Sequence, residues 1–70
     1  MEPRLQLAAN IRRLRREAEL TQERLADLAG THPAEISRLE RAERDPRFST
    51  LIRVARGLDV PPGALLADMD

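Results

Sequence analysis

Residues 21–40 read TQERLADLAGTHPAEISRLE, which is two short helical patterns separated by a glycine. Thr21 is a residue type that commonly caps a helix N-terminus, and apolar residues follow it at helical spacing. Gly30 can adopt at little cost the left-handed conformation that ends a helix. Pro33 suits the first turn of a second helix, which we expect to begin near His32. The stretch therefore predicts two helices joined by a tight turn.

The two helices also have the residues they need to cross closely. Ala26 is small enough to let the second helix approach the first, and Ile36 and Leu39 would anchor the second helix on a core. The remaining side chains of the second helix would then lie outside: His32, Pro33, Ala34, Glu35, Ser37 and Arg38. This is the arrangement of a helix-turn-helix, here over about residues 21–42, whose second helix enters the major groove of DNA.

The flanking segments also predict helices, and none of them alternates like a β-strand. We expect a first helix over about residues 5–18, because apolar residues recur on one face at spacings of three and four. Ser49 is expected to cap a fourth helix, and Pro61-Pro62 to open a short fifth one. The predicted fold is a compact, all-α, five-helix domain that spans residues 1–70.

The composition excludes several classes of protein. The chain has no cysteine and one histidine, so we expect no disulfide, no metal site and no cofactor. Phe48 is the only aromatic residue, whereas proteins that bind RNA or single strands use stacking rings. No apolar run approaches the roughly 20 residues of a membrane span, so we expect a cytoplasmic protein and no membrane partner. The sequence offers no pair of nucleophile and general base, so we do not expect an enzyme.

The charges are segregated along the chain, although the formal net charge is zero. Residues 1–16 carry five arginines and one glutamate, and residues 32–56 carry six arginines and four acids. Residues 17–31 and the tail from residue 57 onward are acidic. The domain can therefore present a basic face to DNA while its opposite end is acidic.

The sequence resembles the lambda Cro and repressor type of helix-turn-helix protein, also called the xenobiotic response element family. The resemblance covers about residues 7–66. It rests on the stretches Ile11–Arg15, Leu20–Ala26, Ile36–Arg41, Leu51–Ala55 and Leu58–Pro62. It implies a lambda-repressor-like fold and a transcription regulator that binds double-stranded DNA, such as a small repressor or a restriction–modification controller.

The resemblance also implies which residues contact DNA. Gln22 matches a glutamine that donates to a phosphate at a helix N-terminus, and Arg47 matches a loop position along the DNA backbone. Arg38 matches a major-groove position where a guanidinium can fork onto guanine; its alternative is a surface ion pair with Glu35. The full expected set of DNA contacts is Gln22, His32, Pro33, Ala34, Glu35, Ser37, Arg38, Arg41, Arg44 and Arg47.

Four further positions have structural meaning in the family. Arg15 and Glu40 match a partly buried salt bridge between the first and third helices, so the resemblance implies that they tie the recognition helix to the scaffold. Glu19 and Ala42 stand where glycine usually ends a helix. Each is strained if the chain needs a positive φ there.

The partners beyond DNA are less determined. One recognition helix reads only a few base pairs, and the resemblance implies a homodimer on two half-sites about 34–36 Å apart. The expected dimer interface is Val60, Pro62, Leu65, Leu66 and Met69; the alternative is that these residues close the core of the monomer. Two protein partners stay open. They are RNA polymerase, through an acidic patch at Glu23 and Asp27, and a toxin, if the chain is an antitoxin or adaptor whose DNA binding is secondary.

Overall fold

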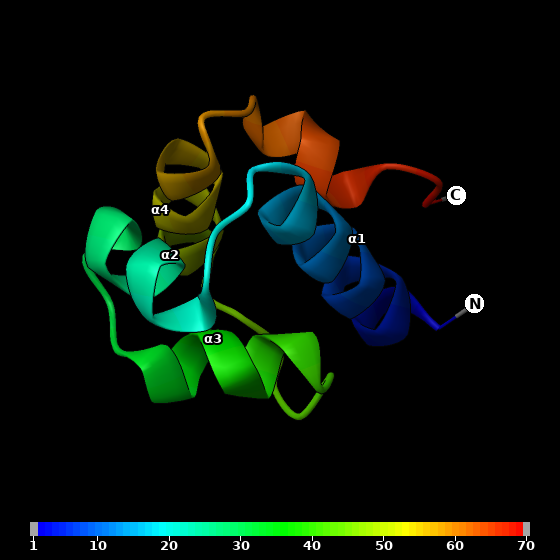
Figure 1. The fold of residues 1–70 in the computed structure, drawn as a ribbon. Coiled ribbons are helices and arrows are strands. Elements are labelled where there is room, and N and C mark those ends of the chain that lie inside the picture. Colours follow the sequence, from blue (N-terminus) through cyan, green and yellow to red (C-terminus); the bar gives the residue numbers. More distant parts are fainter. Residues whose placement is uncertain (1, 70) are drawn as a thin grey trace.

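The computed structural model describes residues 2–69, which form four α-helices and one 3-10 helix (Figure 1). The elements are α1 (Pro3–Glu17), α2 (Gln22–Ala29), α3 (Pro33–Glu40), α4 (Phe48–Leu58) and η1 (Pro62–Leu66). The prediction of an all-helical domain is confirmed, but the prediction of five α-helices is wrong. The last element has only five residues, too few for an α-helix to compensate the cost of its first turn, and short pieces favour 3-10 geometry.

The predicted signals at both ends of α2 are present. The Thr21 hydroxyl accepts a hydrogen bond from the backbone N–H of Arg24 at 3.0 Å. Gly30 ends the helix in the left-handed conformation, with φ of 69°. At α4, however, Arg47 and not Ser49 occupies the N-cap position. The carbonyl of Arg47 already accepts from the N–H of Leu51 at 3.1 Å, so the helical hydrogen bonds begin earlier than the serine suggested.

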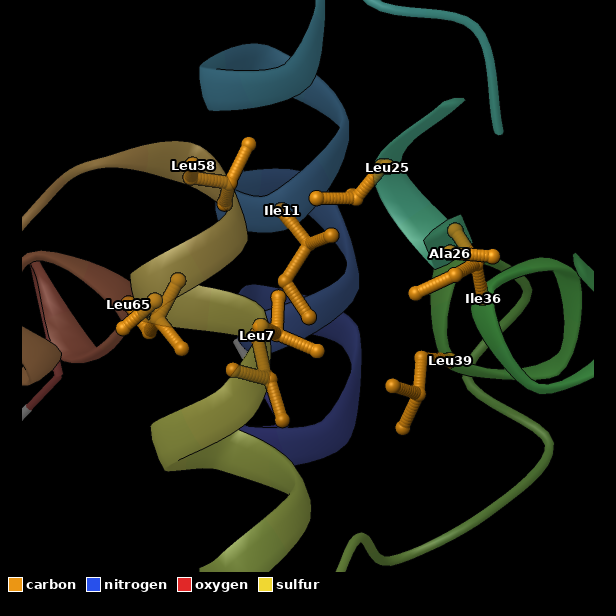
Figure 2. Close-up of a cluster of buried hydrophobic side chains, with 10 residues drawn as sticks. Leu7, Ile11, Leu25, Ala26, Ile36, Leu39, Leu58 and Leu65 are labelled. Atoms are coloured by element: carbon orange, nitrogen blue, oxygen red, sulfur yellow. The ribbon is translucent and has the colours of Figure 1, made fainter. Parts of the chain in front are cut away.

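The core is a single cluster to which all five elements contribute (Figure 2). Its members are Leu7, Ile11, Leu25, Ala26, Ile36, Leu39, Val54, Ala55, Leu58 and Leu65. Ile36 and Leu39 are 0% and 1% exposed, as the helix-turn-helix pattern predicted. Each fully buried leucine or isoleucine stabilises the fold by about 1.5–3 kcal/mol relative to an exposed one. α3 is therefore held firmly against the rest of the domain.

The two expected departures from glycine do require a left-handed backbone. Glu19 has φ of 58° and Ala42 has φ of 59°. Each follows a helix, α1 and α3 respectively, and its conformation lets the chain turn back on the last carbonyls of that helix. A residue with a Cβ costs about 1–2 kcal/mol in this conformation. The chain thus ends α1 and α3 with strain that a glycine would not carry.

A buried asparagine that the sequence did not single out fastens η1 to α1. Asn10 is 2% exposed, and its Nδ2 donates to the carbonyls of Leu65 and Ala67, both at 2.8 Å. Its Oδ1 accepts from Nε2 of Gln6 at 3.0 Å. Because all of these polar groups are paired, Asn10 can lie in the core without leaving an unsatisfied group. The C-terminal segment is therefore attached by specific hydrogen bonds as well as by Leu65.

Candidate nucleic-acid interface

α3 lies on the surface of the molecule. In Figure 1 it forms the lower edge of the domain, with α2 and then α4 above it and α1 to the right. Only one face of the helix is committed to the core, through Ile36, Leu39 and Glu40. An α-helix is about 10–12 Å across, and the major groove of DNA is about 12 Å wide. α3 can therefore enter a major groove while its inner face stays packed.

The outer face of α3 consists of small and polar side chains. From the N-terminal end, these are His32, Pro33, Ala34, Glu35, Ser37 and Arg38. His32 occupies the N-cap position, but its side chain makes no capping hydrogen bond. Arg38 has no ion-pair partner within residues 2–69. The alternative considered for it, a surface pair with Glu35, is absent there, and Glu35 pairs with Arg44 instead. The expected readout residues thus form one continuous face.

The loop between α3 and α4 places three more arginines beside this face. Arg44 pairs with Glu35 over 3.7 Å, and Arg41 pairs with Glu43 over 3.0 Å. Both arginine side chains remain more than half exposed, so these pairs contribute little to stability and can exchange for phosphate. Arg47 is exposed and lines the same polar hollow as Glu35 and Arg44. The fold therefore gathers the predicted loop contacts next to α3.

A second, more open hollow lies where the N-terminal ends of α2 and α3 meet. It is lined by Arg15, Thr21, Gln22, Glu23, Pro33, Ala34 and Ser37. The first backbone N–H groups of α2 lack partners within the helix, and the helix dipole makes this end positive. An anion such as a phosphate is favoured at such a position. Gln22 therefore lies where its predicted partner would be bound.

Arg15 and Glu40 form the ion pair that the resemblance implied. Nε of Arg15 donates to Oε2 of Glu40 at 2.6 Å, and Nη2 donates to Oε1 at 3.0 Å. The side chains are 14% and 3% exposed, and Nη1 of Arg15 also donates to the carbonyl of Leu20 at 2.8 Å. The hydrogen bond to Glu40 raises the pKa of Arg15; desolvation opposes this rise, and the negative charge of Glu40 adds to it. The ion pair joins α1 to α3.

Two contacts of Glu40 were missed in the sequence. Its backbone carbonyl accepts a hydrogen bond from Nη1 of Arg12, and its Oε1 accepts one from Nε2 of Gln22 at 3.1 Å. Arg12 precedes Arg15 by three residues, so both project from the same side of α1, and this spacing was the available signal. Glu40 thereby connects α1, α2 and α3.

The five residues expected at a dimer interface do not share one environment. Leu65 is 1% exposed, because η1 packs its side chain against α1 and α4, so it belongs to the core of its own subunit. Val60 and Met69 are partly buried against that core. Pro62 and Leu66 are exposed, Leu66 by 48%. The monomer-core alternative therefore describes Leu65, and only the outer part of the set is available to a partner.

The acidic patch considered for RNA polymerase is partly neutralised. Glu23 and Asp27 are both exposed on α2, but Asp27 pairs with Arg24 over 2.8 Å.

No helix within residues 2–69 is both long and apolar enough to cross a membrane. Within the same residues, no three histidine, cysteine or acidic side chains gather as metal ligands would.

Comparison with known proteins agrees with this geometry. The HTH_3 helix-turn-helix family model matches residues 11–65. Control protein C.SmaI from Serratia marcescens is 42% identical over 60 residues, which cover 86% of this chain and 71% of C.SmaI.

Two solved structures share the fold. The restriction-modification controller protein C.AhdI from Aeromonas hydrophila superposes with a TM-score of 0.89 at 28% identity, covering 93% of this chain and 98% of C.AhdI. The DNA-binding domain of the P22 C2 repressor superposes with a TM-score of 0.83 at 27% identity, covering 100% of this chain and 92% of that domain. By its relatives and its fold the chain is a DNA-binding transcription regulator, and it belongs to the HTH_3 helix-turn-helix family.

Proposed function

We propose that the chain binds a palindromic DNA operator as a homodimer, with α3 of each subunit in the major groove. The observation that carries this proposal is the outer face of α3. Ile36 and Leu39 hold the helix from behind, while Ser37 and Arg38 project outward and Arg38 has no ion-pair partner within residues 2–69. A guanidinium that is not committed to a carboxylate can fork onto O6 and N7 of guanine.

Phosphate contacts on both sides of α3 would fix its register in the groove. Gln22 and the N-terminus of α2 would hold a phosphate on one side, and Arg44 and Arg47 would hold the backbone on the other. Ser37 can donate to a base or a phosphate, and Pro33 and Ala34 can contact a thymine methyl group. These roles are supported by the positions of the side chains around the two hollows that flank α3.

A homodimer follows from the size of the readout surface. α3 has eight residues and is about 12 Å long, so one copy spans only a few base pairs. Two copies related by a two-fold axis would read two half-sites one helical turn apart. Leu66 and Pro62, which are exposed beside the partly buried Val60 and Met69, are the surface we propose for the contact. The similarity to C.SmaI and C.AhdI favours a controller protein among regulators of this size.

Binding of the purified protein to short duplexes from the region upstream of its gene tests this function. Fluorescence anisotropy over a range of salt concentrations, with a shuffled duplex as the control, measures both affinity and sequence preference. We expect cooperative binding of two subunits to a palindromic fragment and a steep loss of affinity with salt. Equal affinity for the shuffled duplex would refute the proposal and favour the antitoxin or adaptor alternative.

A further inference from the structure

We propose that Glu40 is a positioning residue for DNA binding, which orients the carboxamide of Gln22 toward the DNA backbone. The inference rests on the proposed function, because it concerns how the phosphate contact of that function is prepared. Glu40 itself is 3% exposed, so its side chain is not part of the protein surface that we propose to contact DNA. It would act only through the side chain of Gln22, which lines the hollow at the N-terminus of α2.

The carboxylate of Glu40 is fixed before it meets Gln22. Oε2 accepts from Nε of Arg15 at 2.6 Å, and Oε1 accepts from Nη2 of the same guanidinium at 3.0 Å. The backbone carbonyl of Glu40 accepts from Arg12, which holds the end of α3 against α1. Two parallel hydrogen bonds from one guanidinium fix the position and the plane of a carboxylate. It is therefore a rigid acceptor.

This acceptor determines which end of the Gln22 amide faces inward. An ionised carboxylate can only accept hydrogen bonds, so it attracts Nε2 of Gln22 and repels Oε1. Nε2 lies 3.1 Å from Oε1 of Glu40 and uses one of its two N–H groups there. The second N–H remains to donate to a phosphate in the hollow. Without Glu40 the Gln22 amide could turn its oxygen toward that phosphate. The contact would then be repulsive, because the amide oxygen and the phosphate oxygens are all hydrogen-bond acceptors.

Holding the amide in advance also lowers the entropic cost of binding. A glutamine side chain that is ordered only in the complex loses rotamer freedom when DNA arrives. Gln22 is already held in the free protein, because Glu40 and the α2 backbone fix both ends of its side chain. The contribution of Gln22 to DNA affinity should therefore depend on Glu40, whereas contacts from the α3–α4 loop should not.

A double-mutant cycle measures that dependence. The affinity for an operator duplex is measured for Gln22→Ala in the native and in the Glu40→Gln background, at a temperature where circular dichroism shows every variant folded. Arg47→Ala, measured in both backgrounds, is the matched control. We expect Gln22→Ala to weaken binding about 3- to 10-fold in the native protein and less than about 2-fold with Glu40→Gln. Arg47→Ala should cost the same factor in both.

The native protein provides a second readout that does not need the Glu40 variant to fold. The chain has two glutamines, Gln6 and Gln22. Gln6 serves as the internal control, because its Nε2 donates to the neutral side chain of Asn10 and not to a carboxylate. In ¹⁵N-resolved spectra, we expect one Nε2 proton of Gln22 to exchange slowly with water in the free protein, and the other to shift when the duplex is added. The amide protons of Gln6 should not shift.

The outcomes separate this inference from the proposed function. An equal cost of Gln22→Ala in both backgrounds, or two rapidly exchanging Nε2 protons on Gln22, overturns the positioning role and leaves DNA binding intact. Absence of duplex binding by the native protein overturns the proposed function, and the positioning role with it.

Discussion

Replacing Glu40 with glutamine should destabilise the fold strongly, because the substitution leaves a nearly buried positive charge without its partner. The Arg15 side chain is 14% exposed and the Glu40 side chain is 3% exposed. Removing one partner of such a pair costs about 3–5 kcal/mol. The amide oxygen of glutamine can still accept one of the two hydrogen bonds from Arg15, so we expect about 2–3 kcal/mol for Glu40→Gln.

That loss is a large part of the stability of so small a domain. At about 0.05–0.15 kcal/mol per residue, a 70-residue chain has about 4–10 kcal/mol in total. In a domain of this size each kcal/mol corresponds to about 4–8 °C in Tm, so we expect a fall of about 10–20 °C. Thermal and urea unfolding, followed by circular dichroism, measure it. Glu43→Gln is the matched control, because Glu43 is half exposed in its pair with Arg41 and should change Tm by little. A Glu40→Gln protein that melts at the native temperature would refute the buried-pair reasoning.

Four other substitutions test the fold by the same unfolding assays. Glu19→Gly and Ala42→Gly should each raise stability by about 1 kcal/mol, since each relieves a positive φ; Glu19→Ala, which keeps a Cβ, should give no gain. Gly57→Ala should lower stability by about 1 kcal/mol, because its Cβ would lie 3.1 Å from the backbone nitrogen of Ala29; a neutral or stabilising result would mean that α2 and α4 can separate slightly. Asn10→Ala should cost about 2–3 kcal/mol, because a buried carbonyl (Leu65) and a partly buried one (Ala67) lose their donor; unchanged stability would show that η1 is held by Leu65 alone.

Local signals predicted the helix-turn-helix well. The cap at Thr21, the left-handed Gly30 and the buried Ile36 and Leu39 are all as expected, because each depends on residues within one or two turns. The C-terminal segment was harder to predict. A proline pair followed by small and apolar residues starts a helical turn, but nothing local distinguishes one 3-10 turn from a short α-helix.

Interactions between distant residues could not be predicted from the pattern. Asn10 donates to carbonyls 55 and 57 residues away, and Gln22 donates to a carboxylate 18 residues away. Such contacts depend on how whole helices are placed, which the spacing of apolar residues does not specify. The Arg15–Glu40 pair was predicted only because the family resemblance supplied it. Leu65 was assigned to a partner interface because an apolar residue near a terminus looks the same in sequence whether it faces inward or outward.

Sequence preference of the Arg38→Ala variant tests the central claim most directly, namely that the outer face of α3 reads base edges. Affinities for the operator duplex and for a shuffled duplex are compared at one salt concentration. Arg56→Ala is the control, because Arg56 lies in the last turn of α4, which leads into η1 and away from α3. We expect Arg38→Ala to lose about 10-fold or more of its preference for the operator while its affinity for the shuffled duplex changes little, and Arg56→Ala to keep the native preference. Native preference in Arg38→Ala, or an equal loss for both duplexes, would contradict base readout by this face.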